Sequence, residues 1–333
     1  MVNNIYPWQS EQWSHITKQY HDDTLPHAFL FTGLKGIGKL HFAHSLVAFL
    51  LCEDKKSSQA CGECKQCRLT IAQTHPDFRL TEPEDGGRII KVDAIRSLVE
   101  FFTLSSLQGG QKITILCPAE ALNNNAANAL LKTLEEPAGH SLIILISHSA
   151  GKLLPTIRSR CQVIDFDTPS PKLAREWLKG SFDGERVPSE AELTALLNLS
   201  FNAPLKAKEY ASLNALAENN QMLDELASLL KNDCLASTVS NRWDDDLFSL
   251  RLAWMLRWLE IILKLRMTGD EVEIQGQHGE KMMRYLAEKC SEQQLLSLYR
   301  ESLTQYRLFL GSSNPNKVLT FEYLLFQWLK LMT

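Results

Sequence analysis

Residues 33–40, Gly-Leu-Lys-Gly-Ile-Gly-Lys-Leu, form the first group in this chain that could bind a phosphate. In a phosphate-binding loop, glycines let the backbone approach the anion, a lysine reaches the terminal phosphates, and a following serine or threonine binds Mg²⁺. Gly33, Gly36, Gly38 and Lys39 fit this pattern, but Leu40 offers a hydrocarbon where the hydroxyl belongs. We therefore expect a degenerate phosphate loop, and the residues leave open whether ATP or ADP still binds there.

The carboxylates that ATP hydrolysis requires are also missing from their expected place. In ATPases of this kind, a carboxylate after a second strand holds Mg²⁺ and a further carboxylate orients water. The strand expected at residues 113–116 is followed by Cys117 and Pro118, and Glu120 comes only later. A thiol is a poor ligand for a hard cation, and proline has no side-chain base. We therefore expect no intrinsic ATPase activity.

Four cysteines follow the phosphate loop, at Cys52, Cys61, Cys64 and Cys67, with the spacing C-x₈-C-x₂-C-x₂-C. Four thiolates suit tetrahedral Zn²⁺ and leave no coordination position open, which is typical of a structural site. We therefore predict a structural zinc site. Iron–sulfur ligation and four unrelated thiols are the alternatives.

The elements expected around these residues alternate between strands and helices. An apolar run at residues 28–32 leads into the glycine loop, and a helical stripe at residues 39–51 leaves it, which is the context that a phosphate loop requires. Further strands are predicted at residues 77–80, 113–116, 142–146 and 163–166, with helices at 92–102 and 124–134. This order predicts an α/β domain with a parallel sheet.

Two prolines in Thr168-Pro-Ser-Pro171 mark a boundary, because they interrupt any regular element. Beyond it the periodicity predicts helices alone, at residues 172–179, 189–199, 204–210, 244–265, 291–310 and 317–331.

The whole chain has 333 residues and a formal net charge of −4, which argues against a strongly cationic nucleic-acid binder. The first residues lack a secretory signal, and the apolar runs are too short to span a bilayer. We therefore expect a cytoplasmic protein whose eight cysteines are reduced or metal-bound.

Two further stretches carry a resemblance. Residues 128–137, Asn-Ala-Leu-Leu-Lys-Thr-Leu-Glu-Glu-Pro, and residues 154–161, Leu-Pro-Thr-Ile-Arg-Ser-Arg-Cys, closely resemble the AAA+ clamp-loader subunits of bacterial DNA polymerase III. The resemblance implies a RecA-like AAA+ domain at residues 1–167 with the four-cysteine insert at 52–67, a small three-helix lid at 168–208, and an all-α collar for oligomerisation at 209–333. It also implies that Arg160, with Ser159 beside it, is an arginine finger that acts in trans.

Within this family, the degenerate loop points to a non-hydrolysing subunit rather than to the ATPase subunit, gamma/tau. The resemblance implies a stator in a hetero-oligomer that loads the sliding clamp on primed DNA, as part of a DNA-directed DNA polymerase holoenzyme. The implied partners are the gamma/tau ATPase subunit, the delta subunit, the sliding clamp and primed DNA, with no membrane.

Two alternatives remain open at this stage. One is an active ATPase of the gamma/tau type with an unusual metal shell. The other is a zinc-dependent DNA-binding adaptor, in which Lys55, Lys56, Lys65 and Arg68 of the cysteine insert contact DNA.

Overall fold

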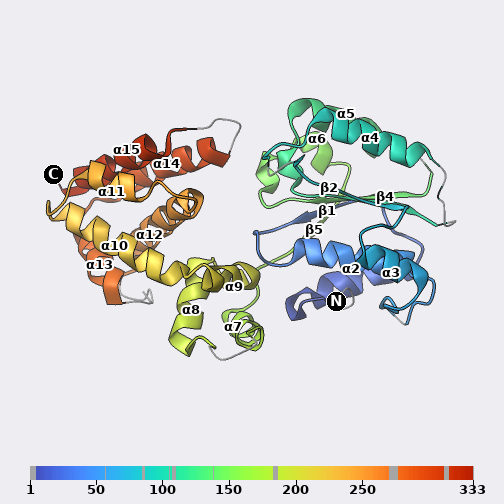
Figure 1. The fold of residues 1–333 in the computed structure, drawn as a ribbon, viewed down its shortest axis with the longest axis horizontal. Coiled ribbons are helices and arrows are strands. Elements are labelled where there is room, and N and C mark those ends of the chain that lie inside the picture. The colour runs from blue at the N-terminus through green and yellow to red at the C-terminus, as the bar shows by residue number, and fades with distance from the viewer. Residues whose placement is uncertain are drawn as a thin grey trace. The chain divides into compact units, whose positions relative to one another are not determined.

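The computed structural model describes residues 5–56, 58–84, 87–104, 106, 110–137, 139–182, 187–269, 277–310 and 315–332 (Figure 1). Ser57 of the predicted cysteine insert lies outside these ranges. The chain divides into two compact units. The first consists of residues 1–174 with 203–206, and the second consists of residues 175–202 with 207–333.

The first unit is built on a five-stranded parallel sheet with the order β2-β3-β4-β1-β5. The strands are β1 (Ala28–Thr32), β2 (Phe78–Thr81), β3 (Lys112–Leu116), β4 (Ser141–Ile146) and β5 (Gln162–Asp165). All five coincide with predicted strands to within a residue or two. The predicted fold class, a parallel α/β domain followed by helical structure, is confirmed.

Both faces of this sheet are covered by helices, which explains why its strands are continuously apolar. On β1, Phe29 and Phe31 enter the core on one face, whereas Ala28 and Leu30 enter the core on the other. In Figure 1, α2 and α3 lie on one face and α4, α5 and α6 on the other. The helices of this unit are α1 (Ser10–His21), α2 (Lys39–Leu51), α3 (Lys65–Ile71), α4 (Val92–Thr103), α5 (Asn124–Glu135) and α6 (Pro155–Arg158).

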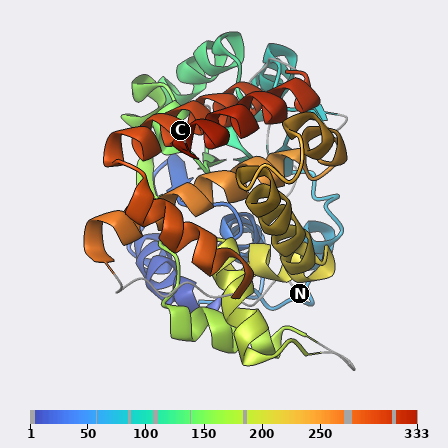
Figure 2. The ribbon, with the colours of Figure 1, turned by 90° about the vertical axis from the view of Figure 1, so that its left-hand side faces the viewer.

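The described part of the second unit is helical and contains no strand. Its core holds four fully buried tryptophans, at positions 243, 254, 258 and 328. Helix α12 packs against α13 and α14, and α14 packs against α15, as Figure 2 shows. From the boundary onward the helices are α7 (Pro171–Gly180), α8 (Glu190–Leu199), α9 (Pro204–Ser212), α10 (Ala215–Leu230), α11 (Ala236–Arg242), α12 (Phe248–Thr268), α13 (Gln277–Lys289), α14 (Glu292–Leu310) and α15 (Lys317–Leu329).

The helical predictions differ from the structure in two respects. Helices α1, α3, α6, α10, α11 and α13 were not predicted, and α12 begins at Phe248 rather than at Asp244. The later start has a local cause: the Asp245 carboxylate accepts a hydrogen bond from the backbone N–H of Leu247 at 2.8 Å, which holds a turn ahead of the helix. Across the described ranges, no helix is both long and apolar enough to cross a membrane.

Candidate phosphate loop, cysteine cluster and arginine

The predicted phosphate loop leaves the carboxyl end of β1 and enters α2, which begins at Lys39. Gly33, Gly36 and Gly38 all have positive φ angles, which residues other than glycine rarely adopt. Space is restricted as well, since a Cβ at Gly33 would lie 2.2 Å from the carbonyl oxygen of Phe166. The glycines are therefore required by the backbone path, whether or not an anion binds.

The lysine of the loop is bonded to the loop itself. The Lys39 ammonium donates hydrogen bonds to the carbonyl oxygens of Gly33 and Leu34, at 2.6 and 2.7 Å. Only 2% of Lys39 is exposed, and this burial lowers its pKa to about 8, against the opposing effect of the nearby Glu120 carboxylate. The cation that would meet a phosphate is thus satisfied by backbone oxygens of its own chain.

A segment near the N-terminus covers the loop. The indole of Trp8 and the side-chain amide of Gln9 both donate to the carbonyl oxygen of Ile37, at 2.9 and 3.0 Å. The ring of Tyr6 stacks on Trp8 and lies so near the loop that a Cβ at Gly38 would come within 2.4 Å of it. We call residues 6–9 the aromatic cover. It holds the loop through contacts between segments nearly thirty residues apart.

A second contact reaches the loop from residues 203–206, which belong to the same unit. The backbone N–H of Leu205 donates to the carbonyl oxygen of Gly36 at 3.0 Å. A Cβ at Gly36 would lie 2.6 Å from Cβ of Lys206. The loop is therefore tightly packed by two other segments of its unit.

The carboxyl ends of β3 and β4 meet β1 at the same edge of the sheet, so Cys117 and His148 lie beside the loop. Burial raises the pKa of Cys117 to about 11 and, together with Lys39 and Lys35, lowers that of His148 to about 3. Both groups are consequently neutral at pH 7. Leu40 packs against the apolar core, as its side chain predicts.

Glu120 is the acidic residue that reaches this edge. One of its carboxylate oxygens accepts the backbone N–H of His148 at 2.9 Å, and the other is buried without a described hydrogen-bond partner. The spacing in the sequence did not predict this position, because Glu120 lies several residues beyond the end of the strand. The short 3₁₀ helix Ala119–Ala121 turns the chain back, which spacing alone does not reveal.

The four predicted metal ligands converge. The sulfur atoms of Cys52, Cys61, Cys64 and Cys67 all lie within 4.8 Å of one another. Three of the separations, Cys52 to Cys61, Cys52 to Cys64 and Cys61 to Cys67, are 3.5, 4.0 and 3.9 Å. A tetrahedral ion with metal–sulfur bonds of about 2.3 Å requires sulfur separations of about 3.8 Å. The cluster could hold one such metal ion.

The backbone supports this cluster. The N–H groups of Cys61, Cys64 and Cys67 donate to the sulfurs of Cys52, Cys61 and Cys64, at 3.3, 3.3 and 3.4 Å. Burial raises the pKa of Cys52 and Cys67, so thiolates at these two positions need a cation to balance them. Nearby, Lys55 donates to the carbonyl oxygen of Cys52 at 2.7 Å and lies over the ring of Tyr20.

The predicted finger residue lies just beyond α6. The Arg160 guanidinium pairs with the carboxylate of Glu135, the last residue of α5, at 2.6 Å, and donates to the carbonyl oxygen of Thr156 at 2.9 Å. The Ser159 hydroxyl donates to the same carbonyl at 3.1 Å. Among the residues that the structure describes, Arg160 makes no hydrogen bond or ion pair with the phosphate loop.

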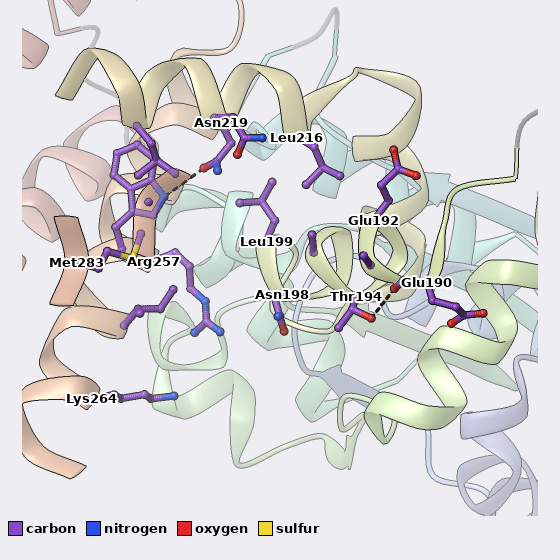
Figure 3. Close-up of a pocket in the computed structure, with 17 residues that line it drawn as sticks. Glu190, Glu192, Thr194, Asn198, Leu199, Leu216, Asn219, Arg257, Lys264 and Met283 are labelled. Carbon is purple, nitrogen blue, oxygen red and sulfur yellow. Dashed lines mark hydrogen bonds between the residues drawn. The ribbon is translucent and has the colours of Figure 1, made fainter. Parts of the chain in front are cut away.

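A cavity of about 710 Å³ lies within the second unit, among α8, α10, α12 and α13 (Figure 3). Its wall is mostly apolar, and Arg257 and Lys264 of α12 supply positive charge. The indole of Trp258 donates to the side chain of Asn219 at 3.1 Å within it. None of the residues predicted from the sequence to bind metal, phosphate or a partner's nucleotide lines this cavity.

Comparison with known proteins identifies the family. Two family models match, "DNA polymerase III, delta subunit" at residues 8–170 and "DNA polymerase III, delta subunit, C terminal" at residues 213–330. The DNA polymerase III subunit delta' of Pseudomonas aeruginosa is 38% identical over 328 residues, which cover 98% of both chains. This chain belongs to the delta' family. The delta' subunit of Yersinia pestis is 30% identical over 98% of this chain and 95% of that one.

A gamma-subunit-related protein of DNA polymerase III from Thermotoga maritima was found among solved structures, with a TM-score of 0.46 and 20% identity, covering 97% of this chain and all of that one. The matches to the delta' subunits extend over nearly the whole chain as well, at 98% of its residues.

Proposed function

We propose that this delta' family member is a non-hydrolysing clamp-loader subunit that donates Arg160 to the ATP of a neighbouring ATPase subunit. The observation that carries the proposal is a contrast within the first unit. The Lys39 ammonium is bonded to carbonyl oxygens of its own loop, whereas Arg160 is about one-third exposed and makes no hydrogen bond or ion pair with that loop among the described residues. A chain built in this way suits activation of another subunit's nucleotide better than turnover of its own.

Three features support the absence of intrinsic ATPase activity. Leu40 packs into the core and provides no hydroxyl for Mg²⁺. Cys117 follows β3 in place of a metal-binding carboxylate, and its raised pKa keeps it a neutral thiol. The Glu120 carboxylate, which reaches this edge of the sheet, accepts a backbone N–H from His148. The aromatic cover and Leu205 further hold the loop in its present form.

The four cysteines would hold a structural Zn²⁺. Their sulfur separations agree with those that a tetrahedral zinc ion requires, and all four ligands are sulfur, which leaves no open position for a substrate. The ion would fix the start of α3 to the end of α2. The adaptor alternative loses support, because Lys55 bonds to the backbone of its own insert.

The partners follow from this role. We expect the chain to act as a stator in a hetero-oligomer with the gamma/tau ATPase subunit and the delta subunit, and to help load the sliding clamp on primed DNA in the cytoplasm. The RecA-like domain would carry Arg160, the short helices from residue 168 to 208 would form a lid, and the helices from residue 209 to 333 would form the collar. Apolar side chains exposed on α15, Leu319, Tyr323 and Phe326, suit such subunit contacts.

The test is Arg160→Ala in the reconstituted clamp loader. A guanidinium that stabilises charge on the transferred phosphoryl group contributes about 10³–10⁵ in rate at the ATP site it serves. We expect a loss of that order at one ATP site, with reduced clamp loading, while size-exclusion chromatography shows an intact complex.

Arg158→Ala is the matched control, since Arg158 is exposed at the end of α6, two residues before Arg160, and has no ion pair among the described residues. Equal losses in both variants would indicate a general need for positive charge, and unchanged rates with Arg160→Ala would defeat the proposal. Mg²⁺-dependent ATP hydrolysis by the isolated chain, abolished by Lys39→Ala, would instead favour the active-ATPase alternative.

A further inference from the structure

Arg160 is held by two firm contacts from two different elements. Its Nη2 atom lies 2.6 Å from Oε1 of Glu135 at the end of α5, and its Nη1 atom lies 2.9 Å from the carbonyl oxygen of Thr156 in α6. A third contact, to the Ser159 hydroxyl, is longer at 3.5 Å. The guanidinium is thus fixed at the place where the ends of α5 and α6 meet.

The position of Glu135 is unfavourable without such a partner. Carbonyl groups at the end of a helix carry partial negative charge, so a carboxylate in the last turn is destabilising. Glu135 is the last residue of α5, and Glu136 follows it as the C-cap. The Arg160 cation compensates the charge of Glu135. Among the described residues, Glu136 has no ion pair, although it carries the same charge one position later.

We propose that Glu135 is the positioning residue of the arginine finger. This inference rests on the proposed function of Arg160 and adds the reason why the finger is ordered before a partner binds. A long arginine side chain loses rotamer freedom when it docks on a phosphate. Glu135 and Thr156 impose that order in the free subunit, so less freedom is lost when the guanidinium enters the neighbouring site.

The contact geometry leaves the finger able to act. A guanidinium has five N–H donors. Glu135 contacts Arg160 through one N–O pair, Thr156 accepts one further bond, and the Ser159 hydroxyl accepts a third, longer one, so two donors remain for phosphate oxygens. Both side chains of the pair are also partly exposed, at 34% for Arg160 and 50% for Glu135, which keeps the guanidinium accessible from outside the chain.

The experiment uses the reconstituted clamp loader with clamp and primed DNA, and its readout is the part of ATP hydrolysis that Arg160→Ala removes. We expect Glu135→Ala to lower kcat for this part by about 3- to 30-fold, the range expected for ordering one long side chain, with KM for ATP unchanged. Glu135→Gln keeps an oxygen acceptor and should lose less. Glu136→Ala removes the same charge from the neighbouring position and should behave like wild type.

A double-variant cycle separates positioning from a structural effect. If Glu135 acts through Arg160, adding Glu135→Ala to Arg160→Ala causes no further loss. A further loss in the double variant, a loss of equal size in Glu136→Ala, or a wild-type or increased rate in Glu135→Ala would each overturn the inference. If Arg160→Ala itself has no effect, the proposed function fails, and that result is distinguishable from failure of the Glu135 inference alone.

Discussion

The buried ammonium of Lys39 makes a prediction that can be worked through in numbers. Burial lowers the pKa of Lys39 to about 8 from its ordinary value of 10.5. One pKa unit corresponds to about 1.36 kcal/mol, so keeping Lys39 charged in the folded chain costs about 3 kcal/mol at pH 7. Lys39→Met removes this cost, but it leaves the carbonyl oxygens of Gly33 and Leu34 without their donor, at about 1 to 3 kcal/mol each. Lys39→Met should therefore change stability only modestly at pH 7.

The pH dependence is the sharper readout. Between the folded pKa and the unfolded pKa, the unfolded chain binds more protons at Lys39, so this residue makes the folded state more stable as pH rises. Relative to Lys39→Met, the wild type should gain about 2 kcal/mol in free energy of unfolding between pH 7 and pH 9.5. Below pH 8 the full cost of burial is present.

The assay is urea unfolding of the full chain at several pH values, with Lys35→Met as the control. Lys35 lies in the same loop, but its side chain is exposed, so this variant should follow the wild type at every pH. A constant difference between wild type and Lys39→Met from pH 7 to 9.5 would refute the reasoning that burial dominates the chemistry of this lysine.

Two further predictions concern His148 and the cysteine cluster. Because the folded pKa of His148 is about 3, below its ordinary value of 6.5, the unfolded chain binds the extra proton first and stability is lost as pH falls through this window. Relative to His148→Gln, the free energy of unfolding of the wild type, measured by urea unfolding, should fall by about 2 kcal/mol between pH 7 and pH 5. Plots of this free energy against pH that run parallel for the two proteins would contradict the prediction. Chelation or the Cys64→Ser substitution should remove one zinc ion per chain, measured by metal analysis. Amide hydrogen exchange should then become faster in residues 52–71, while strands β1 and β4 stay protected. Unchanged exchange in metal-free wild type would show that the cluster does not depend on an ion.

The sequence by itself determined the features whose signals are local. Strands β1, β3 and β4 were predictable because they are covered on both faces and are continuously apolar. The start of α5 was predictable because Asn123 accepts the backbone N–H of Ala126, a bond between residues three positions apart. The cysteine cluster was predictable for a similar reason, since three of its four sulfurs come from a short stretch with a recurrent metal-ligand spacing.

The tertiary structure alone decided which groups from distant parts of the chain meet. The aromatic cover reaches Ile37, Glu120 turns back to the backbone of His148, and Glu135 pairs with Arg160. No periodicity or spacing encodes these pairs, because each depends on how the sheet brings separate loops to one edge or how two helix ends pack. The bonds of Lys39 to its own backbone likewise follow from three-dimensional packing, because a buried cation needs oxygen acceptors that the fold brings near it.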